Sequence, residues 1–179
     1  MIRAPRLGII IGVSREDFIM PTRSKAIAFR DEIIVPTLTT LNLYSEAAAE
    51  LLLGTALQES RLVYRRQLGD GPARGLFQME MATHDDIWNN YLKYRSTLRN
   101  AVTQLKSDPD ADPEGELETN DAYAAAMARV QYKRAPKALP EAGDVEGMAA
   151  YWKLYYNTPL GDGTVAQYVS NYTGVMGSK

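Results

Sequence analysis

Hydrophobic residues recur at helical spacing over most of the chain. Residues 45–62 (SEAAAELLLGTALQESRL) are rich in Ala and Leu, and Ser45 is well suited to cap their first turn. Residues 76–105 carry apolar side chains every three or four positions. Residues 26–43, 122–134, 145–157 and 165–172 have the same helical character, with Pro36 expected to kink or split the first of these. The pattern therefore predicts a mainly α-helical protein.

The remaining segments interrupt the helical pattern. Residues 1–23 are rich in β-branched and then in polar residues, and we expect an extended N-terminal arm there. Within it, residues 7–11 are expected to form a short strand or part of the arm. Residues 24–179 are expected to form one domain. Residues 64–75 hold three glycines and a proline, which predicts a loop. Residues 107–121 hold seven acids and no base, which predicts a solvated loop.

The acidic segment partly imitates a calcium-binding loop. Asp108, Asp110 and Asp112 have the spacing of the first ligands of an EF-hand. The sixth position is Pro113 instead of Gly, and the twelfth is Thr119 instead of Glu. We therefore expect no calcium site in this segment.

Composition narrows the function classes. The 179 residues are 45% hydrophobic and 23% charged with a net charge of −2, and without a basic block a nucleic-acid surface is not expected. The chain has no cysteine and one histidine, His84, and this composition disfavours a metal centre or a Ser-His-Asp triad. We therefore expect no metal or cofactor. We expect His84 and Trp88 to have structural roles. No stretch is long enough to span a membrane, and residues 7–11 are too short for an export signal.

Glu59 is the candidate for catalytic chemistry. On a helical wheel with Leu51 at zero, apolar side chains fill an arc from about 0° to about 240°, and Glu59 falls at about 80°. A carboxyl group on an apolar face is costly to ionise, so its pKa should rise and leave a proton donor near neutral pH. The alternative is a glutamate at a helix end that turns to solvent or pairs with an arginine.

The segment from Glu59 to Thr83 resembles the lytic transglycosylase domain of the lysozyme-like superfamily. That family carries a catalytic Glu followed by Ser at a helix end, a loop with glycine, and then a run of the form G-A-R-G-L-M-Q-L-M-P-A-T. The matching residues here are Glu59-Ser60, Ala73 to Met79, and Ala82-Thr83. Glu80 and Met81 depart from the run, where the family has an apolar residue and Pro. The resemblance implies a lysozyme-like helical fold.

The resemblance also implies roles for single residues. Glu59 would be the general acid and base, Ser60 would lie in the substrate site, Gly75 would let the backbone approach a sugar, and Gln78 would bond an N-acetyl group or orient Glu59. Core-lining alternatives remain open for Gly75 and Gln78.

Two further positions stay open. The family's later Y-N-A-G-P element is not intact, and its tyrosine corresponds either to Tyr132, which has the better helical context, or to Tyr156, which keeps the Tyr-Asn pair. Asp70 is the candidate for a second carboxylate, as in goose-type lysozymes, or else it supports the turn between Gly69 and Gly71.

The function implied is cleavage of the β-1,4 bond between N-acetylmuramic acid and N-acetylglucosamine in peptidoglycan. Transglycosylases use one Glu and form an anhydro sugar, whereas a second carboxylate would permit hydrolysis. Because no export signal is evident, we expect a bacteriophage virion or another delivery route to bring the protein to the periplasm or cell wall, with residues 1–23 docking on other virion proteins. The alternative is a non-enzymatic virion structural protein that keeps the fold.

Overall fold

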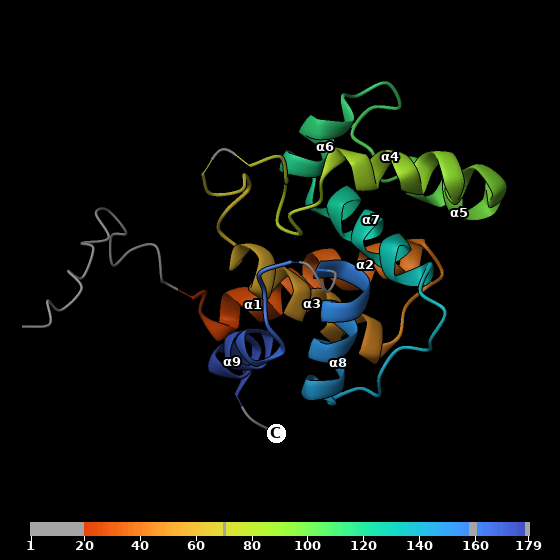
Figure 1. Ribbon diagram of the computed structural model, residues 1–179. Coiled ribbons are helices and arrows are strands. Elements are labelled where there is room, and N and C mark those ends of the chain that lie inside the picture. The colour runs from red at the N-terminus through yellow and green to blue at the C-terminus, as the bar shows by residue number, and fades with distance from the viewer. Residues whose placement is uncertain (1–19, 70, 158–160, 178–179) are drawn as a thin grey trace, which may run out of the picture.

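The computed structural model describes residues 20–69, 71–157 and 161–177, and within them it is mainly α-helical with no sheet (Figure 1). Isolated bridges join Arg66 to Arg74 and Arg74 to Met79. The α-helices are α1 Arg23–Phe29, α2 Val35–Thr40, α3 Glu46–Ser60, α4 Met81–Asn90, α5 Ser96–Thr103, α6 Pro113–Thr119, α7 Asp121–Lys133, α8 Val145–Trp152 and α9 Val165–Met176. Shorter helical turns are η2 Arg30–Ile34, η3 Leu92–Tyr94 and η4 Lys153–Asn157.

The helix boundaries follow local chemistry. The Ser45 hydroxyl accepts a hydrogen bond from the backbone of Ala48, which confirms the predicted cap of α3. Pro36 stands in the first turn of α2, directly after the π-helical turn η2; the backbone stays helical from Arg23 to Thr40, so the helix predicted over residues 26–43 changes to π geometry before the proline but is not split. The strand expected at residues 7–11, and most of the N-terminal arm, lie outside the described residues.

Two predictions about segments need correction. Residues 107–121 are not a solvated loop throughout, because they contain α6, which the Asp112 carboxylate caps and Pro113 begins. Residues 76–105 do not form one helix, because the backbone leaves helical geometry at Tyr91 and the chain continues as η3 and α5. Tyr94, which the periodicity placed on the apolar face, is 71% exposed.

Helix α3 is buried on nearly all sides. The helical wheel left Glu50 and Gly54 on a polar side, yet both are buried. The hydroxyl of Tyr168 in α9 donates to the Leu51 carbonyl, and a Cβ atom on Gly54 would lie 1.9 Å from that hydroxyl. The missing side chain at Gly54 therefore allows α9 to pack directly against α3.

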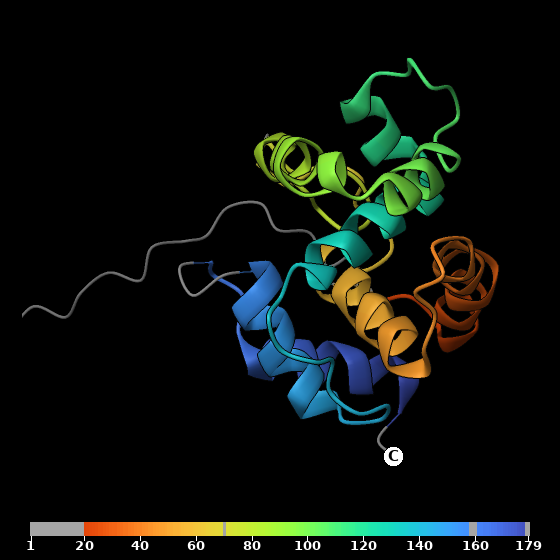
Figure 2. The same cartoon turned by 90° about the vertical axis from the view of Figure 1, so that its right-hand side faces the viewer.

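Helix α7 runs between α4, α5 and α6 on one side and α1, α3, α8 and α9 on the other (Figures 1 and 2), and it contributes to two hydrophobic cores. One core joins α1, α2, α3, α8 and α9, and the other lies under α4, α5 and α6. Tyr132 and Ala128 of α7 belong to the first core, whereas Tyr123 and Met127 belong to the second. An apolar helix with packing partners on all sides fits such a central position.

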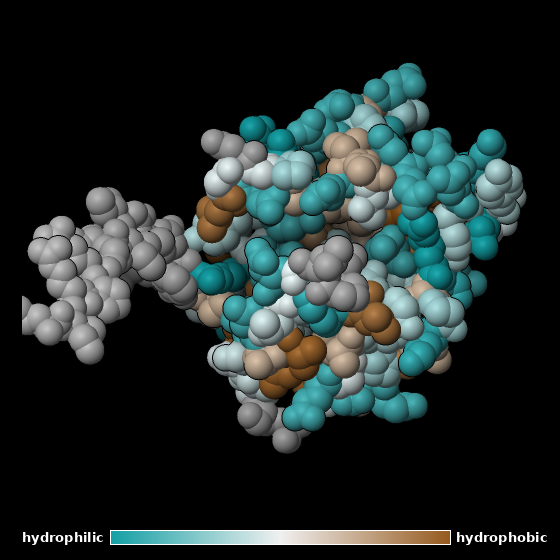
Figure 3. Space-filling model, in the orientation of Figure 1, coloured by the Kyte–Doolittle hydropathy of each residue, from teal (hydrophilic) through white to brown (hydrophobic). Residues whose placement is uncertain are grey.

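The surface in Figure 3 is mostly hydrophilic, and its hydrophobic residues occur in small separate groups. Within the part of the chain that the structure describes, no helix combines the length and apolar character needed to cross a bilayer.

Candidate functional site

A cavity of about 770 Å³ lies beside the C-terminal end of α3. Its walls come from the last turn of α3, the loop between α3 and α4, the start of α4, the end of α7, η4 and the segment before α9. The lining residues are Glu59, Tyr64, Gln67, Leu68, Ala73, Gln78, Met79, Glu80, Thr83, Gln131, Tyr156, Asn157, Gly161, Asp162 and Gly163. Segments far apart in the sequence thus converge on Glu59, as a ligand site requires.

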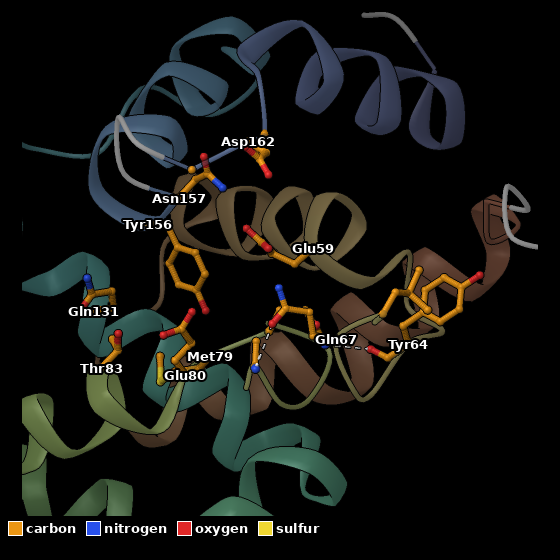
Figure 4. Close-up of a pocket in the computed structure, with 15 residues that line it drawn as sticks. Glu59, Tyr64, Gln67, Met79, Glu80, Thr83, Gln131, Tyr156, Asn157 and Asp162 are labelled. Atoms are coloured by element: carbon orange, nitrogen blue, oxygen red, sulfur yellow. Dashed lines mark hydrogen bonds between the residues drawn. The ribbon is translucent and has the colours of Figure 1, made fainter. Parts of the chain in front are cut away.

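Glu59 is partly buried in the wall of this cavity. Figure 4 shows it at the end of α3, with Asn157 and Asp162 on one side and Gln67 and Glu80 on the other. The indole Nε1 of Trp152 donates a hydrogen bond of 2.8 Å to its Oε1. Burial raises the pKa of Glu59 to about 7, while the hydrogen bond from Trp152 acts in the opposite direction. The carboxyl group is therefore available in both protonation states at neutral pH.

Trp152 is itself held rigidly. It is fully buried at the end of α8, and its ring lies 5.5 Å, centroid to centroid, from that of Tyr168. A Cβ atom on Gly163 would lie only 2.5 Å from the edge of the indole, so the segment before α9 passes directly against the ring. The sequence analysis did not single out Trp152, because helical spacing does not reveal which partner an indole reaches.

The backbone around the site adopts uncommon conformations. Arg61 (φ 55°), Leu62 (φ 54°) and Gln78 (φ 46°) all have positive φ without being glycine. Such conformations cost about 1–3 kcal/mol each and are common at functional sites. Arg61 and Leu62 follow the last residue of α3, Ser60, whereas Gln78 lies in the cavity wall.

Ser60 lies behind the cavity wall. Its single hydroxyl proton faces two carbonyl acceptors, Leu76 at 2.7 Å and Ala56 at 3.0 Å, and its oxygen accepts from the backbone N–H of Leu62. It is buried and does not line the cavity. These bonds join the end of α3 to Leu76, within the run that resembles the transglycosylase motif, so we assign Ser60 a structural role in place of the substrate contact that the resemblance implies.

Gly75 packs against α6, whereas Gln78 lines the cavity. Gly75 has φ 73°, and a Cβ atom there would lie 1.9 Å from the carbonyl oxygen of Leu117, so its close backbone approach is to α6. Gln78 lines the cavity, and its Nε2 donates to the carbonyls of Tyr64 and Gly75. Those bonds fix the amide plane, and no described residue bonds its Oε1, which leaves an acceptor for a ligand.

The two candidate tyrosines are stacked, but only one reaches the cavity. The ring centroids of Tyr132 and Tyr156 are 5.2 Å apart. Tyr132 is fully buried, with its hydroxyl bonded to Thr55, whereas Tyr156 lines the cavity and donates to the Phe77 carbonyl. Burial raises the pKa of both phenols well above the ordinary value. The position preferred from sequence, Tyr132, thus lies behind the one that keeps the Tyr-Asn pair.

The cavity contains carboxylates that the sequence did not single out. Asp70, the predicted second carboxylate, lies outside the described residues. Glu80 and Asp162 line the cavity and are exposed. The sequence offered a signal for Glu80, since it replaces an apolar residue of the resembled run, but nothing marked Asp162.

Three ion pairs brace one wall of the cavity. Arg65, Arg66 and Arg74 of the loop pair with acids of the segment predicted to be solvated. The pairs are Arg65–Asp121 at 2.7 Å, Arg66–Glu118 at 2.9 Å and Arg74–Glu114 at 2.7 Å. The loop that carries Gln78 is therefore tied to α6 and to the start of α7.

His84 and Trp88 lie in the second core. Both bond the hydroxyl of Tyr123, over 2.8 Å from His84 Nε2 and 3.0 Å from Trp88 Nε1. This arrangement agrees with the structural role expected for them. Across residues 20–69, 71–157 and 161–177, no three His, Asp or Glu side chains come together as metal ligands would.

Comparison of the chain with protein-family models, with curated proteins and with solved structures found no match.

Proposed function

We propose that this protein is a glycosidase of the bacterial cell wall, a lytic transglycosylase or lysozyme-like muramidase that cleaves the β-1,4 bond between N-acetylmuramic acid and N-acetylglucosamine. The observation that carries the proposal is Glu59, a carboxyl group in a cavity wall whose pKa burial raises to about 7. The resemblance of residues 59–83 to the transglycosylase motif, and the mainly helical structure, support the same proposal. It includes a lysozyme-like fold for residues 24–179.

The chemistry begins with proton donation. A protonated Glu59 donates to the glycosidic oxygen, and the bond to the anomeric carbon breaks through an oxocarbenium-like transition state. The resulting Glu59 carboxylate then accepts a proton, either from the 6-hydroxyl of the same sugar as it closes an anhydro ring, or from a water molecule that attacks the anomeric carbon. The bond from Trp152 Nε1 stabilises the carboxylate between these steps.

Other cavity residues supply binding and water activation. In this proposal the Oε1 of Gln78 accepts from an N-acetyl N–H and the ring of Tyr156 contacts a sugar; both residues line the cavity, which supports these roles. Glu80 and Asp162 are candidates to position a water molecule, which would favour hydrolysis. The substrate is the glycan strand of peptidoglycan, and no cofactor is required.

The proposal includes delivery by a bacteriophage virion or another carrier to the periplasm or cell wall, with residues 1–23 docking on virion partners. A non-enzymatic virion protein is the second candidate, favoured by the Glu80-Met81 departure from the family run.

The decisive experiment compares the wild type with Glu59→Gln on purified peptidoglycan, with products identified by mass. The Gln side chain keeps the size of Glu59 and can accept from Trp152, but it cannot donate a proton to the leaving oxygen. We expect turnover in the wild type and a loss of at least about 100-fold in the variant. Anhydro-ended products indicate a transglycosylase, and reducing ends a hydrolase. Equal activity in both proteins, or none in the wild type on several wall types, contradicts the proposal.

A further inference from the structure

Arg129 is a buried arginine that makes no hydrogen bond or ion pair with any described residue. It lies in α7, and only 7% of the residue is exposed. Its Nε is fully enclosed and has no hydrogen-bond partner, the one such side-chain atom in the part of the chain that the structure describes. Buried guanidinium groups normally pair with a carboxylate or with several carbonyls. An unpaired one calls for a missing partner.

No described carboxylate compensates the charge of Arg129. The groups that act on it electrostatically are Tyr151 and Tyr91, and tyrosine is uncharged at neutral pH. Burial is the main influence on Arg129 and lowers its pKa, as expected for a cation removed from water without a counter-ion. The site therefore has an excess of positive charge.

The two phenols that act on Arg129 are hydrogen-bonded elsewhere, so neither neutralises its charge. The hydroxyl of Tyr151 donates to the Lys137 carbonyl, and that of Tyr91 donates to the Lys133 carbonyl, so both phenols are fixed in place. A second guanidinium, that of Arg95, lies 3.6 Å from the centroid of the Tyr91 ring. The Nη nitrogens of Arg129 have no described partner and are not fully enclosed, so they provide the face on which a ligand can bind.

We propose that Arg129, buried in α7 with an enclosed Nε that no described residue bonds, forms a binding site for a small oxyanion. A carboxylate or phosphate group accepts two parallel hydrogen bonds from the planar guanidinium, and the low local polarity strengthens them. Carboxylates of peptides and phosphates of anionic polymers share this chemistry. The site is separate from the Glu59 cavity, which Arg129 does not line.

The experiment follows the guanidinium directly. The ¹⁵N–¹H resonance of Arg129 Nε, assigned by its loss in Arg129→Lys, is recorded as sodium phosphate or sodium acetate is added at constant ionic strength, with sodium chloride as reference. We expect a saturable shift with at least one oxyanion. A shift with phosphate alone points to phosphate ligands, and a shift with acetate points to carboxylates. No saturable shift with either anion overturns the proposal.

Thermal unfolding supplies a second readout. The melting temperature of the wild type should rise with the anion that shifts the resonance. The rise in melting temperature should disappear in Arg129→Met. In Arg129→Lys the same rise should need about tenfold more anion, because lysine keeps the charge but lacks the two parallel N–H donors of the guanidinium. Arg99→Met removes an exposed arginine of α5 and should keep the full rise. An equal rise in Arg129→Met contradicts the proposal. If that variant does not fold, the resonance titration of the wild type decides.

Discussion

The indole Nε1 of Trp152 lies 2.8 Å from Oε1 of Glu59, although 93 residues separate the two in the sequence. The bond joins the last turn of α3 to the end of α8 at the wall of the main cavity. It places a neutral hydrogen-bond donor on a carboxyl group that burial would otherwise keep protonated to still higher pH.

Trp152→Phe tests this relationship. Removing the donor should raise the pKa of Glu59 further above 7, because the bond favours the ionised form. The pKa of Glu59 is measured from the ¹³C chemical shift of its carboxyl group. The free energy of unfolding should also fall by about 1–3 kcal/mol, because the larger indole ring and its hydrogen bond are lost. Trp88→Phe is the control, since its Nε1 bonds Tyr123 in the other core. An unchanged Glu59 pKa in Trp152→Phe contradicts the prediction.

Glu59→Gln should change stability in a pH-dependent way. The carboxyl group titrates near 7 when folded and near 4.5 when unfolded, so its contribution is complete below pH 4.5 and is lost as pH rises to about 7. Above pH 7 the wild type has lost up to about 3 kcal/mol of its free energy of unfolding through this titration. The variant has no carboxyl group at this position and does not lose it. The free energy of unfolding of Glu59→Gln minus that of the wild type should therefore increase from pH 4 to pH 7.5 in urea titrations.

Glu118→Gln is the opposite control. The hydrogen bond from Arg66 lowers the pKa of Glu118, so its contribution is present at neutral pH and is lost in acid. The free energy of unfolding of Glu118→Gln minus that of the wild type should therefore decrease as pH rises. A flat profile for Glu59→Gln would mean that Glu59 is solvated and not desolvated.

Tyr156→Phe and Tyr132→Phe separate the two candidate tyrosines. Tyr156→Phe removes the donor to the Phe77 carbonyl at the cavity and should weaken glycan-oligosaccharide binding several-fold in calorimetry on the Glu59→Gln background. Tyr132→Phe removes a buried bond to Thr55 and should cost about 1 kcal/mol of stability without changing affinity. The reverse result would show that the buried tyrosine controls the site.

Gly75→Ala should be strongly destabilising. The residue has φ 73° and its new methyl group would overlap the backbone of Leu117, for a loss of about 3 kcal/mol or more. Gly174→Ala is the matched control, because nothing lies within 4 Å of a Cβ atom there and the residue is in α9. That change should stabilise by about 0.5–1 kcal/mol. Denaturant unfolding of both variants checks the pair.

Helix positions could largely be predicted from sequence, and the contents of the site only in part. Periodicity and capping located α3, α7 and α8 because these signals are local. The wheel misjudged Glu50, which is buried and accepts from the backbone N–H of Gly143, because tertiary packing is not local. Glu59 could be found because a carboxylate inside an apolar arc is unusual, whereas Trp152 and Asp162 join the site only through the path of the folded chain.

The division of α7 between two cores bears on how the protein unfolds. Neither core can lose its packing without uncovering a face of the same helix, so we expect one cooperative transition and not two. Each core has its own reporter, Trp152 in the first and Trp88 packed against the second. Variants with a single tryptophan should therefore show coincident midpoints, and the cavity beside Glu59 should form only when the whole molecule has folded.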